Sequence, residues 1–226
     1  MSDPATPARP PVPMRLAHQP VSQGLVVPHI TLAHRDRSRP VWGKVDPERL
    51  WDTFSRKLCQ ICGQGLGDRV VLFIRPADYL HGLAVEPGCH PECGRYSSRA
   101  CPMLAARQNR YNPHPRERFN RCSDPACNCW QWRASEPDPR EAPREGQPAE
   151  AWYEASISIA EYSVIHDPGT ADTPPAVGIN LRGVELLKLR KVRDAAPAAD
   201  RQSQPVDLLA SIVAVRALFG ESGELS

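Results

Sequence analysis

The chain has 226 residues, of which 25 are proline and only 41% are hydrophobic. Because proline removes a backbone donor and fixes φ, this composition predicts long connecting segments and small folded units that need a staple such as a metal. The formal net charge of +2 excludes a strong overall attraction to nucleic acid or to anionic membranes. No apolar run approaches the ~20 residues of a membrane span, and no secretory signal opens the chain. We therefore expect a cytoplasmic protein whose eight cysteines stay reduced.

The first predicted element is a helix that follows a long proline-rich segment. Residues 1–45 hold eight prolines and no sustained apolar periodicity, which predicts a disordered arm. Asp46 is a good N-cap, and Pro47 suits the first helical position. Apolar residues then recur at helical spacing, so we expect a short amphipathic helix that runs into Cys59; these residues are Leu50, Trp51, Phe54 and Leu58.

Two short strands and a second helix are expected next. Residues 70–74 form an apolar, β-branched run of strand length, and residues 83–85 are a candidate second strand of a β-hairpin. A helix is predicted to start at Pro91 and to run through Ala100, because Pro102 disfavours its continuation.

The rest of the chain alternates linkers with small ordered regions, which predicts an α+β protein overall. The expected organisation is a cysteine-rich module over residues 46–133, a linker over 134–150, a small β-rich region over 151–193, a second linker over 194–204 and an amphipathic helix over 205–220.

Four residues in the cysteine-rich module have the spacing of a zinc site. Cys59 and Cys62 can wrap one metal from a tight turn, and His90 and Cys93 lie at the predicted start of a helix. Four nitrogen and sulfur ligands in a tetrahedron suit Zn²⁺, and a closed site of this kind is structural rather than catalytic. The order of knuckle, hairpin and helix is that of a treble-clef finger. The alternatives are Cys89 in place of His90, or unligated cysteines beside a surface histidine.

Three further cysteines within eight residues predict a second metal site: Cys122, Cys127 and Cys129. Cys101 is the expected fourth ligand, and His114 is the alternative. Four thiolates can also hold an iron–sulfur cluster, although these spacings differ from the common ferredoxin runs. We therefore expect one Zn²⁺ at the first site and a second Zn²⁺ here, the remaining alternative being thiols without a metal.

Several motifs together resemble a family of uncharacterised actinobacterial and actinophage zinc-binding proteins. They are a Cys-x2-Cys-Gly knuckle, a strand that ends in Arg-Pro-x-Asp, the run from His90 to Met103 that reads His-Pro-Glu-Cys…Tyr-Ser…Cys-Pro-Met, and the closely spaced cysteines and tryptophans from Cys122 to Trp132. The resemblance covers roughly residues 57–192 and implies cysteine clusters without a known activity. The proline-rich arm and the terminal helix depart from the family.

The first functional hypothesis is a non-enzymatic structural-zinc protein that associates with nucleic acid. Between Arg95 and Arg133, eight arginines against two acidic residues give a local charge of about +6, and aromatic residues are interleaved with them. The alternative is a solvated basic face. The arginines expected to contact nucleic acid are Arg95, Arg99, Arg107, Arg110, Arg116, Arg118 and Arg121.

Two further hypotheses concern a protein partner and an enzyme. A protein–protein adaptor would use the apolar stripe of the helix over residues 205–220, which can equally cover the protein's own strands. A metal nuclease of the His-Asn-His type would need a general-base histidine and further ligands. His81 and Asp78 lie near a turn, but residues 63–89 contain no asparagine. No membrane partner and no small-molecule substrate is inferred.

Overall fold

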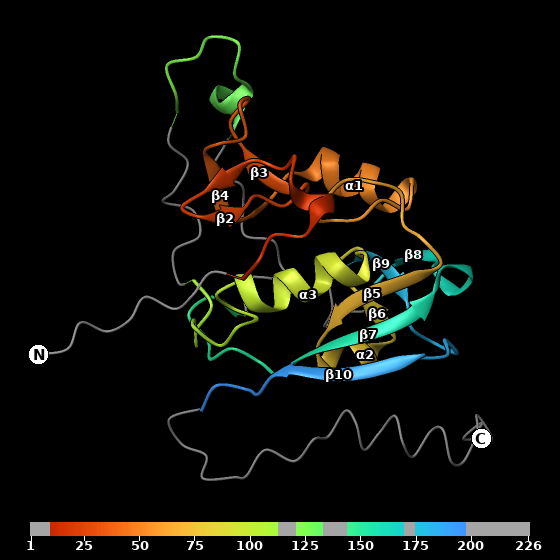
Figure 1. Ribbon diagram of the computed structural model, residues 1–226. Helices are drawn as coiled ribbons and strands as arrows, with labels where there is room; N and C mark the ends of the chain where they lie inside the picture. The colour runs from red at the N-terminus through yellow and green to blue at the C-terminus, as the bar shows by residue number, and fades with distance from the viewer. Residues whose placement is uncertain (1–9, 113–120, 133–143, 170–174, 198–226) are drawn as a thin grey trace, which may run out of the picture.

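The computed structural model describes residues 10–112, 121–132, 144–169 and 175–197, and over these ranges it confirms the predicted α+β class (Figure 1). None of the helices in these ranges is long and apolar enough to cross a bilayer. The predicted helix over residues 205–220 lies outside the described residues. The helices are α1 (Pro47–Ser55), α2 (Pro76–His81) and α3 (Pro91–Ala100), with short 3-10 turns at Met14–Leu16, Asn128–Gln131 and Ile159–Glu161.

The N-terminal segment is folded over residues 10–45, so the prediction of a disordered arm is wrong for this part of residues 1–45. Two small antiparallel pairs form there: β1 (Val21–Ser22) with β2 (Leu25–Val26), and β3 (Thr31–Ala33) with β4 (Pro40–Val45). Leu16 and Val26 are buried in one core with Cys59 and Cys62. The apolar residues here are few and irregularly spaced, so the sequence shows no helix or strand periodicity. They are buried because they pack against a segment that is distant in the sequence.

The main sheet has three antiparallel strands in the order β10-β7-β5: β5 (Arg69–Ile74), β7 (Trp152–Ser158) and β10 (Lys188–Arg193). Successive side chains point to opposite faces, so each strand divides its residues between two environments. Leu72, Ala155 and Ile157 are buried in a core on one face. Val71 and Phe73 on the other face pack in the same core as Tyr96 of α3. Figure 1 shows α3 between this sheet and the N-terminal pairs.

A second sheet has the order β6-β9-β8: β6 (Leu83–Ala84), β9 (Ala176–Asn180) and β8 (Val164–Asp167). The strands predicted at 70–74 and 83–85 are therefore both present, but they belong to different sheets and do not pair as a hairpin. An isolated β-bridge between Val71 and Cys89 joins β5 to the segment just before α3. Both sheets combine strands of the predicted module 46–133 with strands of the predicted region 151–193.

Helix α2 was not predicted from the sequence, because Pro76 directly after an apolar run is also typical of the end of a strand. Proline also suits the first position of a helix, where its missing N–H is not needed. The Asp78 carboxylate accepts a hydrogen bond from the backbone N–H of Arg75 at 2.8 Å and another from its guanidinium, which fixes the first turn. The Arg75 side chain is 1% exposed and also contacts Glu150.

Candidate metal centres and a basic groove

The first group of potential ligands begins in the knuckle that Cys59 and Cys62 form. The Gly63 N–H donates to the Cys59 carbonyl at 2.8 Å, which closes the turn. Gly63 has φ +75°, and a Cβ built there would lie 2.6 Å from His29 Nδ1. A glycine is therefore needed at this position both for the left-handed backbone and for the close approach of the N-terminal segment.

Helix α3 supplies the other half of the group. His90 is its N-cap residue and Cys93 lies in its first turn, so one end of the helix presents both side chains. The four ligand atoms of Cys59, Cys62, His90 and Cys93 lie within 4.8 Å of one another, and all four residues are buried. This group can hold a metal ion, as the spacing predicts.

Histidine 90 is oriented for ligation through one particular nitrogen. Its Nδ1 lies 3.4 Å from Cys62 Sγ, and its Nε2 lies 2.9 Å from the Gly65 carbonyl oxygen. A carbonyl accepts only from a protonated nitrogen, so Nε2 carries the hydrogen and Nδ1 has a free lone pair for a metal. Cys89 is not in the group: its thiol is fully buried and donates to the Val71 carbonyl at 3.4 Å.

The thiols of this group are close enough to alter one another's ionisation. A hydrogen bond from Cys62, assisted by one from Cys93, lowers the pKa of Cys59 far below the usual thiol range. The same bond with Cys59, together with burial, raises the pKa of Cys62 to about 11. One thiolate thus forms readily and repels the next. A bound divalent cation removes that repulsion, because it is attracted to each thiolate in turn.

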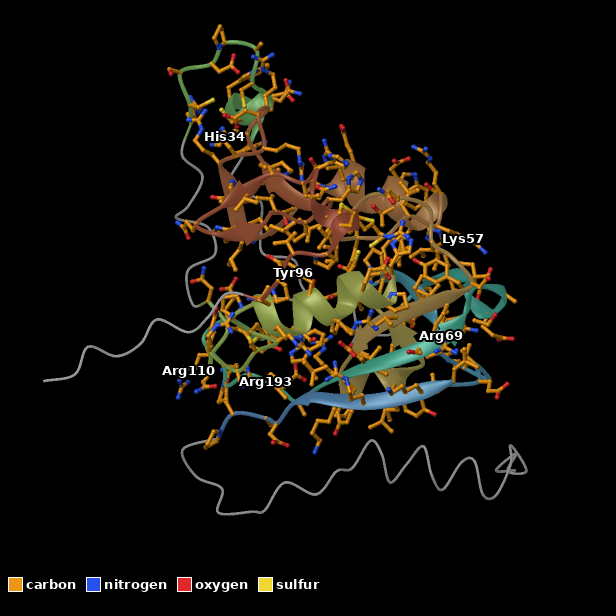
Figure 2. The ribbon with its side chains drawn as sticks, viewed as in Figure 1. His34, Lys57, Arg69, Tyr96, Arg110 and Arg193 are labelled. Atoms are coloured by element: carbon orange, nitrogen blue, oxygen red, sulfur yellow. The ribbon has the colours of Figure 1, made fainter. Side chains whose placement is uncertain are left out.

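A second group unites Cys122, Cys127 and Cys129 with His34, whose ligand atoms also lie within 4.8 Å of one another. The Cys122 and Cys129 sulfurs are 3.5 Å apart, and Cys127 Sγ lies 3.6 Å from His34 Nδ1. His34 follows β3 at the end of the β3–β4 hairpin, where Figure 2 labels it. This group too can hold a metal ion.

The prediction that Cys101 is the fourth ligand of the second group is wrong. Cys101 caps the C-terminus of α3 and packs partly buried against the core around Val71 and Phe73, away from the other three cysteines. His114, the alternative, lies outside the described residues. The fourth member is instead His34, which no spacing rule singles out because it is far from the cysteines in sequence.

Contacts between the hairpin and the loop over residues 121–132 hold the second group together. Arg35 Nε donates to Asp124 Oδ2 at 2.9 Å, and the rings of His34 and Trp132 are 4.8 Å apart. Burial opposes ionisation of the Cys127 thiol, but hydrogen bonds from the backbone N–H groups of Arg35 and Cys129 lower its pKa to about 6. The lowered pKa favours the thiolate of Cys127, which is the form that ligates metals.

The arginines expected to contact nucleic acid have different roles in the structure. Arg107 donates to the carbonyls of Arg99 and Ala100, and Arg110 donates to the carbonyl of Gly146, so these two hold backbone segments together. Arg121 is exposed. Arg116 and Arg118 lie outside the described residues. Arg95 and Arg99 remain exposed on α3 and line a groove.

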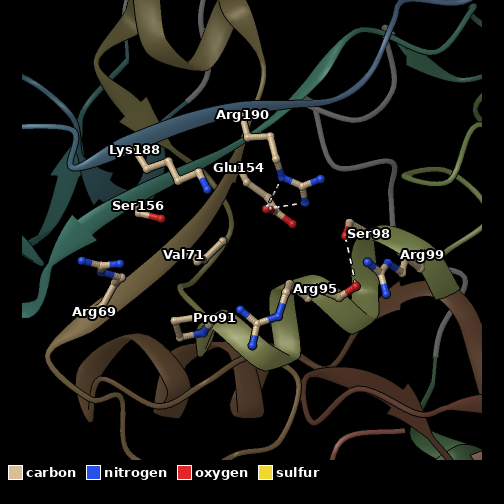
Figure 3. A pocket seen from close by; sticks show the side chains of 10 residues that line it. All are labelled: Arg69, Val71, Pro91, Arg95, Ser98, Arg99, Glu154, Ser156, Lys188 and Arg190. Carbon is tan, nitrogen blue, oxygen red and sulfur yellow. Dashed lines mark hydrogen bonds and ion pairs between the residues drawn. The ribbon is translucent and has the colours of Figure 1, made fainter. Parts of the chain in front are cut away.

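The groove lies between α3 and the main sheet and has a volume of about 180 Å³ (Figure 3). Strand register explains its floor: Lys188 lies opposite Ser156, and Arg190 lies opposite Glu154. These pairs lie on the same face of the sheet as α3. The helix covers this face over β5 and leaves it open over β10. The lining residues are Arg69, Val71, Pro91, Arg95, Ser98, Arg99, Glu154, Ser156, Lys188 and Arg190.

The groove is strongly positive. It has five cationic residues and one carboxylate, and Arg190 is bound to that carboxylate, Glu154, at 2.6 Å. The other four cations are exposed and have no acidic partner among the described residues: Arg69, Arg95, Arg99 and Lys188. Sequence reasoning missed the contribution of β10 and β7, although the alternation of Lys188, Leu189 and Arg190 is the signal of a strand with one polar face.

The two residues considered for a nuclease do not form a metal-binding group in the described part of the chain. Asp78 is bonded to Arg75, and His81 Nε2 lies 2.7 Å from Asp167 Oδ2 at the surface. Neither belongs to the two groups described above.

Comparison with known proteins finds no protein-family model, no curated protein and no solved structure that matches this chain. The resemblance to actinobacterial and actinophage zinc-binding proteins therefore stays a prediction from the motifs alone.

Proposed function

We propose that the chain is a non-enzymatic protein that binds nucleic acid through the groove between α3 and the main sheet, on a scaffold held by two structural zinc ions. The observation that carries the proposal is the set of four exposed cations around one concavity, none of which has an acidic partner in the described part of the chain. Phosphates of a nucleic-acid backbone are the anions that such clusters of arginine and lysine recognise.

Zinc is the metal that best fits both groups. Each offers three sulfurs and one imidazole nitrogen, a donor set that suits tetrahedral Zn²⁺. Four protein ligands leave no open position for a substrate or a water, so each site would be structural. A knuckle followed by ligands in the first turn of a helix supports a treble-clef-like centre, although the two strands between them lie in different sheets and not in a hairpin.

The first zinc would position the groove directly. It would tie the knuckle to α3, whose Arg95 and Arg99 form one wall of the groove. Gly94, between the ligand and these arginines, lets α3 lie close to β5: a Cβ there would be 3.2 Å from Val71 Cγ1. The metal, the helix and the cationic wall are therefore parts of one rigid arrangement.

The test is a fluorescence anisotropy titration of the full-length protein with labelled single-stranded DNA at several salt concentrations. Four phosphate contacts predict a log–log slope of the binding constant against salt of about −3 for single strands. Replacing Arg95 and Arg99 together by glutamine should reduce that slope by about half and weaken binding, because two of the four contacts are lost.

The control is Arg56→Gln, which removes one positive charge from an exposed arginine at the end of α1, outside the groove. It should leave the slope unchanged. Binding that is absent, or that does not vary with salt, would refute the proposal, as would an equal loss in the control and in the groove variant. The adaptor alternative depends on residues 205–220, and no contact among the described residues favours it.

A further inference from the structure

We propose that the groove holds one unpaired nucleotide, whose phosphate lies among the exposed cations and whose base donates a hydrogen bond to Glu154. This inference rests on the proposed nucleic-acid binding and specifies its form. It predicts a preference for single strands over duplexes, and for bases with an exocyclic amino group over thymine.

The carboxylate of Glu154 has one satisfied oxygen and one unsatisfied oxygen. Oε2 accepts hydrogen bonds from Arg190 Nε at 3.0 Å and from Arg190 Nη2 at 2.6 Å. Oε1 is buried and has no hydrogen-bond partner among the described residues. The residue as a whole is only 9% exposed. A buried acceptor without a donor is unfavourable, and a ligand that supplies the donor gains the difference.

The position of this oxygen decides what kind of ligand can reach it. Glu154 lies on the floor of the groove, and Figure 3 shows its carboxylate in the space between β10 and the Arg95 side of α3. The groove has a volume of about 180 Å³, which exceeds the space that a single water needs. A lone phosphate would leave the floor empty and would be repelled there by the carboxylate.

A ligand with an anionic end and a donor end satisfies both parts of the groove. In a nucleotide these are the phosphate and the N–H groups of the base. In a duplex the base stays stacked inside the helix, so a buried acceptor in a small concavity is reached only by a base that has left the stack. The groove thus favours a single strand or a strand end.

The choice of base follows from the charge of the acceptor. The cytosine amino group at N4 donates readily to a carboxylate. Thymine has its N3–H donor between two carbonyl oxygens, and a carboxylate repels both. Cytosine and thymine are similar in size, so oligo(dC) and oligo(dT) differ mainly in this contact. A charge-assisted hydrogen bond of this kind supports a preference of about tenfold for oligo(dC).

The experiment is an anisotropy titration of the full-length protein with short labelled oligo(dC), oligo(dT) and a duplex of the same length, in mildly alkaline buffer. The expected order of affinity is oligo(dC), then oligo(dT), then the duplex. The ratio between the two single strands should be the same at each salt concentration, because both release the same number of counterions.

Glu154→Gln is the variant that tests the assignment. Glutamine keeps an oxygen for Arg190 and places its NH₂ group where Oε1 lies, so a donor replaces the acceptor and the preference should disappear or reverse towards oligo(dT).

Equal wild-type binding to both strands, tighter binding to the duplex, or an unchanged ratio in a folded E154Q protein would each overturn the inference. If both strands bind equally but with the expected salt slope, the proposed function survives. If no probe binds, both proposals fail. If E154Q does not fold, the ratio of the wild-type affinities for oligo(dC) and oligo(dT) still tests the inference.

Discussion

A Cys62→Ser protein is expected to lose the first zinc and to unfold around the knuckle and α3. Metal binding in small zinc modules is worth about 10–16 kcal/mol of apparent free energy. That range is comparable with the whole stability of a typical domain, about 5–15 kcal/mol. The knuckle and α3 share a core with the N-terminal strand pairs and with β5. The loss of folded structure should therefore extend to those pairs and to β5. Circular dichroism and metal content measured on the same sample report the two changes together.

The matched control is Cys89→Ser. Cys89 is as deeply buried as the ligands, but its thiol donates to the Val71 carbonyl and lies outside the ligand group. A serine hydroxyl can donate to the same carbonyl, so this protein should keep its zinc and its fold. Loss of zinc in Cys89→Ser, or retention of all zinc in Cys62→Ser, would show that the ligand assignment is wrong.

His34→Ala is expected to lower the zinc content from two per chain to one. Removing one of four protein ligands opens the second site, and the loop over residues 121–132 then loses its attachment to the β3–β4 hairpin. Arg35 and Asp124 form a pair that is too exposed to replace the metal, since solvent screens the attraction between exposed charges. Metal quantification of the purified variant gives the result directly.

The control for this variant is Cys101→Ser, which removes the thiol expected from sequence spacing and leaves His34 in place. It should retain both zinc ions. The His34→Ala protein should also retain salt-dependent binding of nucleic acid, because the groove is built from α3 and the main sheet. Zinc loss in Cys101→Ser without loss in His34→Ala would restore the interpretation drawn from spacing.

Local chemistry in the sequence predicts the helices that have clear start signals. Asp46 caps α1 as expected, accepting hydrogen bonds from the backbone N–H groups of Glu48 and Arg49. Helix α3 runs from Pro91 to Ala100, the range predicted from the two flanking prolines. The first ligand group was also predicted, because each of its halves is a local motif and the helix turn brings His90 and Cys93 together.

Features that depend on distant segments were not predictable in the same way. His34 and Cys127 are separated by 93 positions, and their proximity follows from how the β3–β4 hairpin packs, which no spacing encodes. The groove has the same origin: its floor depends on the register that places Lys188 opposite Ser156. The composition of the arginine-rich stretch after α3 predicted a binding surface, yet Arg107 and Arg110 bind backbone carbonyls. The groove cations without an acidic partner among the described residues come from α3, β5 and β10.

We propose that two closed zinc centres, each with three cysteines and one histidine, hold this fold. X-ray absorption at the zinc edge, on protein whose metal content has been quantified, tests it most directly. The expected result is two zinc ions per chain, with an average shell of three sulfurs at about 2.3 Å and one nitrogen at about 2.0–2.1 Å. A chain without zinc, a shell that contains water oxygens, or an average of more than three sulfurs would contradict it.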